Sequence, residues 1–132
     1  MSCVFCDIAA KKAPAHIVDE NERFMAFLDI YPSQKGQTLI IPKKHAGYIF
    51  ELSDEDISDL FKYAKRIAKA IDKSLKPLRT CIVVEGFLID HVHVRLHPCF
   101  EKSLRFDPLP KPSDAELKET CEKIRKALQS GP

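Results

Sequence analysis

Three of the chain's five histidines alternate with apolar residues in the run H-V-H-V-R-L-H at residues 91–97. Successive side chains of a β-strand point to opposite faces, so a strand here would place the apolar residues in a core. His91, His93, Arg95 and His97 would then share the other face, about 7 Å apart at successive steps. Burying such a row adds nothing to stability, because each group needs a polar partner. We interpret the row as functional; the alternative is a solvated polar face on an edge strand.

Two chemistries suit these residue types. A neutral imidazole is a competent nucleophile near pH 7, and the planar, permanently charged guanidinium of Arg95 suits phosphate. A histidine beside such an arginine predicts attack on phosphorus, with a phospho- or nucleotidyl-histidine intermediate. Metal binding by the same row is the alternative, because imidazoles suit zinc. The Cys-x-x-Cys pair of Cys3 and Cys6 is a further candidate for metal or redox chemistry.

The spacing of apolar residues predicts the helices that support this row. Ser53 is a helix N-cap followed by three acidic residues, and apolar residues then recur at helical spacing over residues 57–71. This pattern predicts a long central helix. Residues 107–112 are rich in proline and predict an extended strap. Ser113 and Glu116 form a capping box that begins a C-terminal helix with one narrow apolar face.

Four runs have the composition of strands and cover residues 23–29, 37–41, 81–84 and 91–98. Strand and helix segments are mixed along the chain rather than alternating. This arrangement favours an α+β fold with an antiparallel sheet. The length of 132 residues predicts a single domain that spans residues 1–132.

The composition is that of a globular chain, with 45% hydrophobic and 30% charged residues. The 21 basic and 19 acidic residues give a net charge of +2, which supplies no field for nucleic-acid binding. No apolar run approaches the ~18 residues of a membrane span, and the N-terminus lacks a secretory signal pattern. We therefore expect a cytoplasmic protein without membrane or nucleic-acid partners, with Cys81, Cys99 and Cys121 reduced and buried.

The histidine row resembles the signature of the histidine triad (HIT) family, H-φ-H-φ-(H/Q)-φ-φ, and matches all but its third polar position. Three upstream segments are similar to the N-terminal half of that family, in the same order. They are F-C-x-I at residues 5–8, F-L-D-I-x-P at 27–32 and G-x-T-L-I-I-P-K-x-H at 36–45. The resemblance runs from about Cys3 to Pro98. It implies an antiparallel sheet of about five strands with one long central helix and a C-terminal helix.

The resemblance implies a role for each candidate residue. His93 would attack the α-phosphate of a nucleotide conjugate, Asp29 would hold the ribose hydroxyls, and Arg95 would lie on the phosphate. An apolar slot for a purine would be lined by Phe5, Ile8, Phe27, Ile30 and Leu39. Plain core packing is the alternative for each of these five. Family members hydrolyse nucleoside phosphoramidates, aminoacyl-adenylates or dinucleoside polyphosphates, or transfer nucleotidyl groups, usually as homodimers that share an extended sheet.

A structural zinc site is implied as well. Zinc-bearing members of the family use a Cys-x-x-Cys near the N-terminus, the histidine of the Pro-Lys-x-His segment and the first triad histidine. The corresponding residues are Cys3, Cys6, His45 and His91, a set suited to tetrahedral zinc. The alternative is an unmetallated cysteine pair with a locally hydrogen-bonded His45.

Three features depart from the family pattern. Arg95 replaces the last triad histidine and cannot give up a proton near neutrality, so His97 is the candidate for that acid role. Gln37 stands where many members have a histidine. Glu85 and Gly86 belong to a short connector that replaces a longer phosphate-binding loop, and we place them with Gln37 at the nucleotide site. The sequence favours a nucleotide hydrolase; the alternatives are a nucleotidyltransferase and a nucleotide-binding module that has lost turnover.

Overall fold

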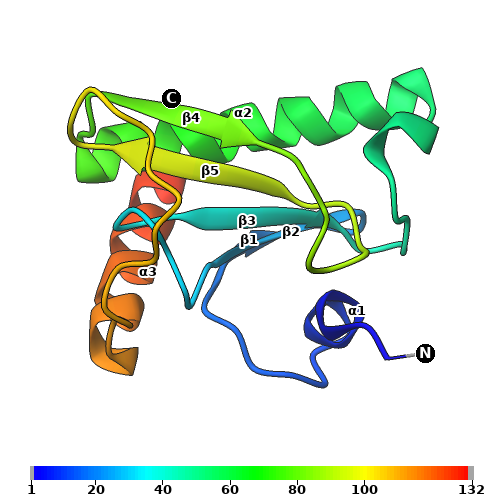
Figure 1. Cartoon of the computed structure of the whole chain (residues 1–132), viewed down its shortest axis with the longest axis horizontal. Coiled ribbons are helices and arrows are strands. Elements are labelled where there is room, and N and C mark those ends of the chain that lie inside the picture. Colours follow the sequence, from blue (N-terminus) through cyan, green and yellow to red (C-terminus); the bar gives the residue numbers. More distant parts are fainter. Residues whose placement is uncertain (1, 131–132) are drawn as a thin grey trace.

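A five-stranded antiparallel sheet forms the centre of the structure, a computed structural model that describes residues 2–130 (Figure 1). The strand order is β1-β2-β3-β5-β4, so β1 and β4 are the edge strands. The strands are β1 (Ile17–Glu20), β2 (Phe24–Leu28), β3 (Thr38–Pro42), β4 (Arg79–Val83) and β5 (Val94–Cys99). The helices are α1 (Val4–Ala9), the short 3-10 helix η1 (Ile49–Glu51), α2 (Asp54–Leu75) and α3 (Asp114–Gln129). The predicted α+β fold, with its long central helix and C-terminal helix, is confirmed.

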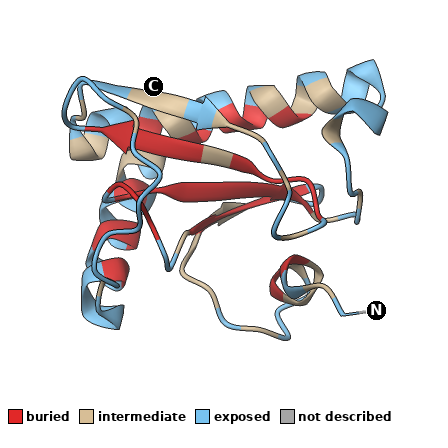
Figure 2. Ribbon diagram, viewed as in Figure 1, coloured by how far each residue is buried: buried red, intermediate tan, exposed pale blue. Residues whose placement is uncertain are grey.

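The helices α2 and α3 cover one face of the sheet, and α1 covers part of the other (Figure 1). Alternate strand residues pack with α2 and α3 in the larger core; among them are Ala26, Ile40, Val94 and Leu96. On the opposite face, Phe5 and Ile8 of α1 pack against Met25, Phe27, Leu39 and Ile41. Burial is concentrated in the central strands and on the helix surfaces that face them (Figure 2). Arg95 pairs with Leu39 across the sheet and therefore lies on the α1 face.

Both predicted helix starts are confirmed by their N-caps. The hydroxyl of Ser53 accepts the backbone N–H of Asp56 at 3.0 Å, and that of Ser113 accepts the N–H of Glu116 at 3.1 Å. Helix α2 ends where Lys76 adopts a left-handed conformation with φ of 54°. The strap between β5 and α3 has no regular secondary structure, as its prolines predict (Figure 1).

The histidine row is only partly a strand, which corrects the prediction of a strand over residues 91–98. Strand β5 begins after His93, because the backbone N–H of Val92 donates to the carbonyl of Ala46 at 2.7 Å instead of joining the sheet. β5 also lies between β3 and β4 rather than at an edge. His91, His93 and His97 have exposed fractions of 0%, 6% and 0%. A solvated polar face is therefore the wrong interpretation of the row.

Two short elements are not predicted by periodicity. Helix α1 has six residues, and its N-cap is Cys3, whose Sγ accepts the backbone N–H of Cys6 at 3.4 Å. Strand β1 has four residues, with an irregular register between Ile17 and Asp19. Cys81 is only half-buried, contrary to expectation, whereas Cys99 and Cys121 are buried. Among residues 2–130, no helix combines the length and the apolar character that a membrane span requires.

Candidate active site

A cavity of about 490 Å³ opens on the α1 face of the sheet and collects most of the predicted site. Its walls come from α1, β2, the loop after β2, β3, the connector before β5, β5 itself and the strap. The predicted residues that line it are Phe5, Ile8, Phe27, Asp29, Ile30, Gln37, Leu39, Glu85, His93 and Arg95. Gly86 and His97 do not line it. The five residues predicted to line an apolar slot therefore lie together at one cavity, although four of them are also buried.

The orientation of His93 leaves one ring nitrogen free. Its Nδ1 lies 2.7 Å from the backbone carbonyl oxygen of His91. A carbonyl oxygen can only accept, so Nδ1 carries the hydrogen and Nε2 of the neutral ring keeps its lone pair. The ring of Phe5 meets His93 edge to face, with ring centroids 5.0 Å apart. A buried, oriented imidazole with a free lone pair at a cavity wall has the properties of a nucleophile.

Asp29 is held at the end of β2 by two hydrogen bonds. One carboxylate oxygen accepts the backbone N–H of Tyr31 at 2.8 Å, and the other accepts Nε2 of Gln37 at 2.7 Å. The side-chain oxygen of Gln37 accepts the backbone N–H of Ser33 at 2.9 Å. Gln37 thus orients the Asp29 carboxylate, and the carboxylate keeps free acceptor sites toward the cavity.

Arg95 provides the positive charge of the cavity. Its guanidinium lies over the ring of Phe106 in the strap, 5.8 Å from the ring centroid. Within residues 2–130 no carboxylate lies within salt-bridge distance of Arg95. A guanidinium at a cavity wall without an acidic neighbour is suited to an anionic group such as a phosphate.

His97 follows Arg95 by two residues in β5 and does not line the cavity. Its Nδ1 is 2.5 Å from the side-chain oxygen of Gln34, and its ring meets that of Phe106 with centroids 5.9 Å apart. Burial, with a smaller contribution from the charge of Arg95, lowers the pKa of His97 to about 4. The ring is therefore neutral near pH 7. It lacks the second proton that the imidazolium form would supply for the predicted acid role.

The depressed pKa of His97 predicts a loss of stability in mild acid. Between pH 6.5 and about 4 the unfolded state binds a proton at this residue that the folded state does not, so stability falls as the pH falls. The full difference is about 3 kcal/mol and levels off below pH 4. Urea unfolding at pH 7.5 and pH 4.5 should show a larger loss for the native chain than for His97→Gln. Equal losses in the two proteins would contradict this assignment.

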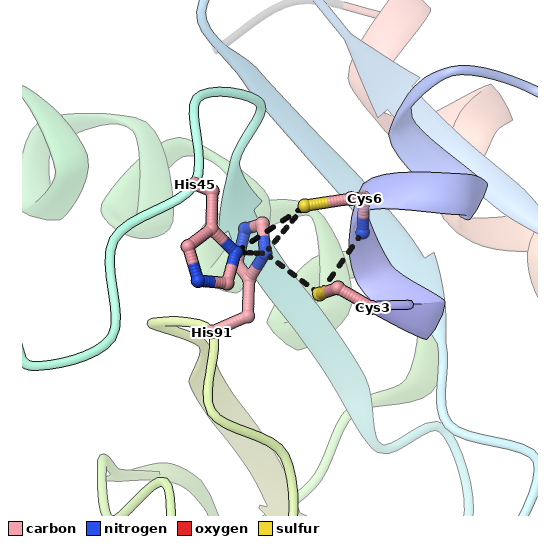
Figure 3. A group of neighbouring side chains, drawn as sticks. All are labelled: Cys3, Cys6, His45 and His91. Atoms are coloured by element: carbon pink, nitrogen blue, oxygen red, sulfur yellow. Dashed lines mark hydrogen bonds between the residues drawn. The ribbon is translucent and has the colours of Figure 1, made fainter. Parts of the chain in front are cut away.

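Four potential metal ligands converge beside the cavity (Figure 3). The ligand atoms of Cys3, Cys6, His45 and His91 all lie within 4.8 Å of one another. Nδ1 of His91 is 3.2 Å from Nδ1 of His45, 3.3 Å from Sγ of Cys3 and 3.5 Å from Sγ of Cys6. Ligands bound tetrahedrally at zinc distances stand about 3.3–3.8 Å apart. The three distances from Nδ1 of His91 lie in or close to this range, and the donor set suits a tetrahedral Cys₂His₂ site.

The protonation of His91 also fits a ligand. Its Nε2 lies 2.8 Å from the carbonyl oxygen of Pro42, which requires the hydrogen on Nε2 and leaves the Nδ1 lone pair facing the cluster. Burial lowers the pKa of His91, which favours the neutral ligand form. Helix α1 places both thiols on its first turn, with Cys3 as its N-cap. The cluster thus joins α1 to the segment that enters β5.

Several residues of the cavity were not accessible to sequence reasoning. They are Val4, Pro14, Ala15, Leu28, Tyr31, Ser33, Leu88, Ile89, Phe106 and Pro108. Phe106 and Pro108 belong to the strap, whose path over the sheet is set by tertiary contacts such as the hydrogen bond from the Leu109 N–H to the Pro32 carbonyl at 2.8 Å. The F-L-D-I-x-P segment was the one available signal for Tyr31 and Ser33, because it marked the loop that carries them.

The five-stranded sheet, the buried histidine run that enters β5 and the adjacent Cys₂His₂ cluster together define a protein of the histidine triad type. Residues 10–102 match the HIT domain, and the chain belongs to this family.

Named relatives agree with this assignment. The chain is 38% identical over 99 residues to an adenosine 5′-monophosphoramidase of Schizosaccharomyces pombe, an alignment that covers 74% of each chain. It is similar to the structure of a hypothetical histidine triad nucleotide-binding protein of Sulfolobus tokodaii, with a TM-score of 0.88, 28% identity and coverage of 97% and 93% of the two chains. A zinc-bound histidine triad family protein of Mycobacterium smegmatis gives a TM-score of 0.85 at 31% identity, covering 98% of this chain and 95% of that one.

Proposed function

We propose that this protein is a nucleotide hydrolase that acts at the α-phosphate of purine nucleotide conjugates through a nucleotidyl-His93 intermediate. The observation that carries the proposal is the 2.7 Å hydrogen bond from Nδ1 of His93 to the His91 carbonyl oxygen, which leaves Nε2 free to attack. The relative in Schizosaccharomyces pombe that bears the name adenosine 5′-monophosphoramidase supports the same reaction class.

The reaction divides into two displacements at phosphorus. In the first, the Nε2 lone pair of His93 forms a bond to phosphorus, and the bond to the leaving group breaks; the leaving atom takes the bonding pair and a proton from water. In the second, a water oxygen forms a bond to phosphorus, the phosphorus–Nε2 bond breaks and returns its pair to His93, and the attacking water gives up a proton to solvent. Positive charge on the imidazole in the intermediate is stabilised by the hydrogen bond to the His91 carbonyl. Arg95 offsets the negative charge of the phosphoryl oxygens.

The nucleoside occupies the part of the cavity next to α1. The purine lies in the slot of Phe5, Ile8, Phe27, Ile30 and Leu39. Asp29 accepts the ribose hydroxyls, and Gln37 holds its carboxylate in place through the 2.7 Å hydrogen bond. Glu85 lies at the rim of the cavity. Gly86 follows it with a positive φ of 79°, a conformation that favours glycine and turns the short connector.

Replacing Asp29 by Asn should weaken AMP binding about tenfold, because the amide retains one acceptor oxygen for two ribose hydroxyls. A nucleotide that lacks both hydroxyls, 2′,3′-dideoxy-AMP, should bind the native protein and Asp29→Asn with equal affinity. Calorimetric titration of both nucleotides into both proteins measures the four dissociation constants. If the variant weakened both nucleotides equally, Asp29 would have a structural role and not the proposed contact with ribose.

The other proposed properties concern the metal and the assembly. We propose that Cys3, Cys6, His45 and His91 hold a structural zinc ion, so that the chain is a zinc-bearing, short-connector member of its family.

We also propose a homodimer in which the β4 edges pair into a continuous sheet. Leu78 and Ile82, at this edge, are 62% and 49% exposed, which supports an apolar contact there. We propose as well that residues 1–132 form a single domain, to which the strap and α3 belong.

A fluorogenic adenosine phosphoramidate tests the proposed activity directly. The purified protein should release the fluorophore and AMP in equal amounts. Release that required an added acceptor, with the nucleotide transferred to it, would favour the nucleotidyltransferase. AMP binding without turnover of any conjugate would favour the binding module, and the absence of both would contradict a nucleotide site.

A further inference from the structure

Two nitrogen atoms beside the cavity are buried without a hydrogen-bond partner. Within residues 2–130, Nε of Arg95 and Nε2 of His97 are the buried side-chain nitrogen or oxygen atoms in this condition. Both belong to strand β5, two residues apart on the same face of the sheet. Buried polar groups are nearly always paired, because an unpaired one loses its hydrogen bonds to water. Two unpaired atoms in adjacent side chains therefore point to a group that pairs with them.

The hydrogen bonds of Gln34 determine which role each atom can play. The amide nitrogen of Gln34 donates to the carbonyl oxygen of Arg105 at 2.8 Å, so its side-chain oxygen is the atom that faces His97. That oxygen can only accept, and Nδ1 of His97 must therefore carry the hydrogen. In the neutral ring Nε2 is then an acceptor, whereas Nε of Arg95 is a donor. The pair suits a group that both donates and accepts.

Phe106 lines the cavity and contacts His97, which does not line it, whereas Arg95 lines the cavity itself. The Phe106 ring contacts both the ring of His97 and the guanidinium of Arg95. The side chain is 59% exposed and belongs to the strap, so it can turn aside without disturbing the core. The residues of the predicted purine slot come from α1, β2, the loop after β2 and β3, and none of them belongs to β5 or the strap. The part of a conjugate beyond the α-phosphate would therefore meet Phe106 and Arg95.

We propose that Arg95, His97 and Phe106 form a leaving-group subsite, in which Nε2 of His97 accepts a hydrogen bond from an N–H on the leaving nitrogen. The inference rests on the proposed hydrolase activity and makes His97 a specificity-determining residue. The subsite favours phosphoramidates of primary amines over those of secondary amines, whose leaving nitrogen carries no hydrogen. A purely anionic leaving group such as pyrophosphate offers Nε2 nothing to accept.

Two AMP amides that are isomers test this selectivity: the butylamide, which has one N–H, and the diethylamide, which has none. The ratio of their kcat/KM values cancels effects on the shared nucleotide. His97→Asn keeps a donor near the position of Nδ1 and removes the acceptor at Nε2, so the ratio should fall about tenfold, through loss of butylamide turnover. His97→Gln, which restores a polar atom near Nε2, should recover most of the ratio. Phe106→Ala, a change at an exposed side chain, should also lower the ratio, because water would then compete with the leaving N–H for Nε2 of His97.

The outcomes separate this subsite from the proposed activity. An unchanged ratio in folded His97→Asn and in Phe106→Ala, with turnover intact, would overturn the subsite and leave the hydrolase standing. An equal loss of kcat/KM for both amides in His97→Asn would also overturn the subsite, since His97 would then have a structural role only. If the native protein hydrolysed neither amide nor any other phosphoramidate, the proposed function would fail and the subsite with it. Thermal unfolding of each variant confirms that it is folded before the ratios are compared.

Discussion

His93→Ala should lower kcat for adenosine phosphoramidate hydrolysis by about 10⁴-fold or more, because it removes the atom that bonds to phosphorus. Nε2 of His93 is the free nitrogen of a ring whose Nδ1 is held at 2.7 Å by the His91 carbonyl. No neighbouring group can replace it: Arg95 has no lone pair at neutral pH, and His97 is buried outside the cavity. Steady-state rates with a fluorogenic substrate measure the loss.

A matched control exists on the surface of the same chain. His16→Ala makes the same substitution at a residue that pairs with Asp114, with 2.9 Å between Nε2 and Oδ1, and that does not line the cavity. Its rates should stay within about twofold of the native values. AMP should still bind to His93→Ala, since the slot and Asp29 are unchanged. Retention of more than a tenth of the native kcat by His93→Ala would exclude His93 as the nucleophile.

The second large effect concerns the metal cluster. Cys3→Ser/Cys6→Ser should bind zinc about 10⁴-fold more weakly, because structural zinc sites are worth about 10–16 kcal/mol and half of the ligands are lost. Serine at position 3 remains a good helix N-cap, so the change isolates metal binding from the start of α1. Competition with a chromophoric chelator measures the affinity, and atomic emission measures the zinc content of each purified protein.

Loss of the metal should also be visible in stability and in catalysis. Zinc at about a hundredfold its dissociation constant stabilises the folded state by about 3 kcal/mol, roughly 10 °C in the unfolding midpoint of a chain of this size. The His91 backbone orients His93, so kcat should fall as well when His91 is released. Cys81→Ser, at a half-buried thiol outside the cluster, is the matched control and should retain zinc. A double variant with native zinc affinity would contradict the assigned ligand set.

Sequence reasoning succeeded where local pattern and spacing carry the information. The N-caps at Ser53 and Ser113, the long helix and the antiparallel sheet follow from periodicity and capping chemistry. The four residues predicted as zinc ligands lie together although they are up to 88 positions apart in the chain. That grouping came from the family resemblance, since spacing alone left the role of the Cys-x-x-Cys pair open.

The rest depends on tertiary contacts. The residues before β5 leave the sheet because the backbone N–H of Val92 donates to the carbonyl oxygen of Ala46. These two segments are far apart in the chain, so no local sequence pattern predicts their contact. His97 bonds to Gln34, which in turn bonds to the carbonyl of Arg105 in the strap, and no local pattern predicts these contacts. Gln37 lines the cavity, and its hydrogen bond to Asp29 is a further contact that the sequence does not predict.

Detection of the covalent intermediate tests the proposed role of His93 directly. The protein is mixed with an adenosine phosphoramidate, and the reaction is quenched within the first turnover. Mass spectrometry then measures the intact protein and its proteolytic peptides under conditions that preserve phosphohistidine. A His93 nucleophile predicts a mass increase of one adenylyl group, located on the peptide that contains His93 and absent from His93→Ala. Rapid turnover without any adenylylated protein, or an adenylyl group on another residue, would contradict that role.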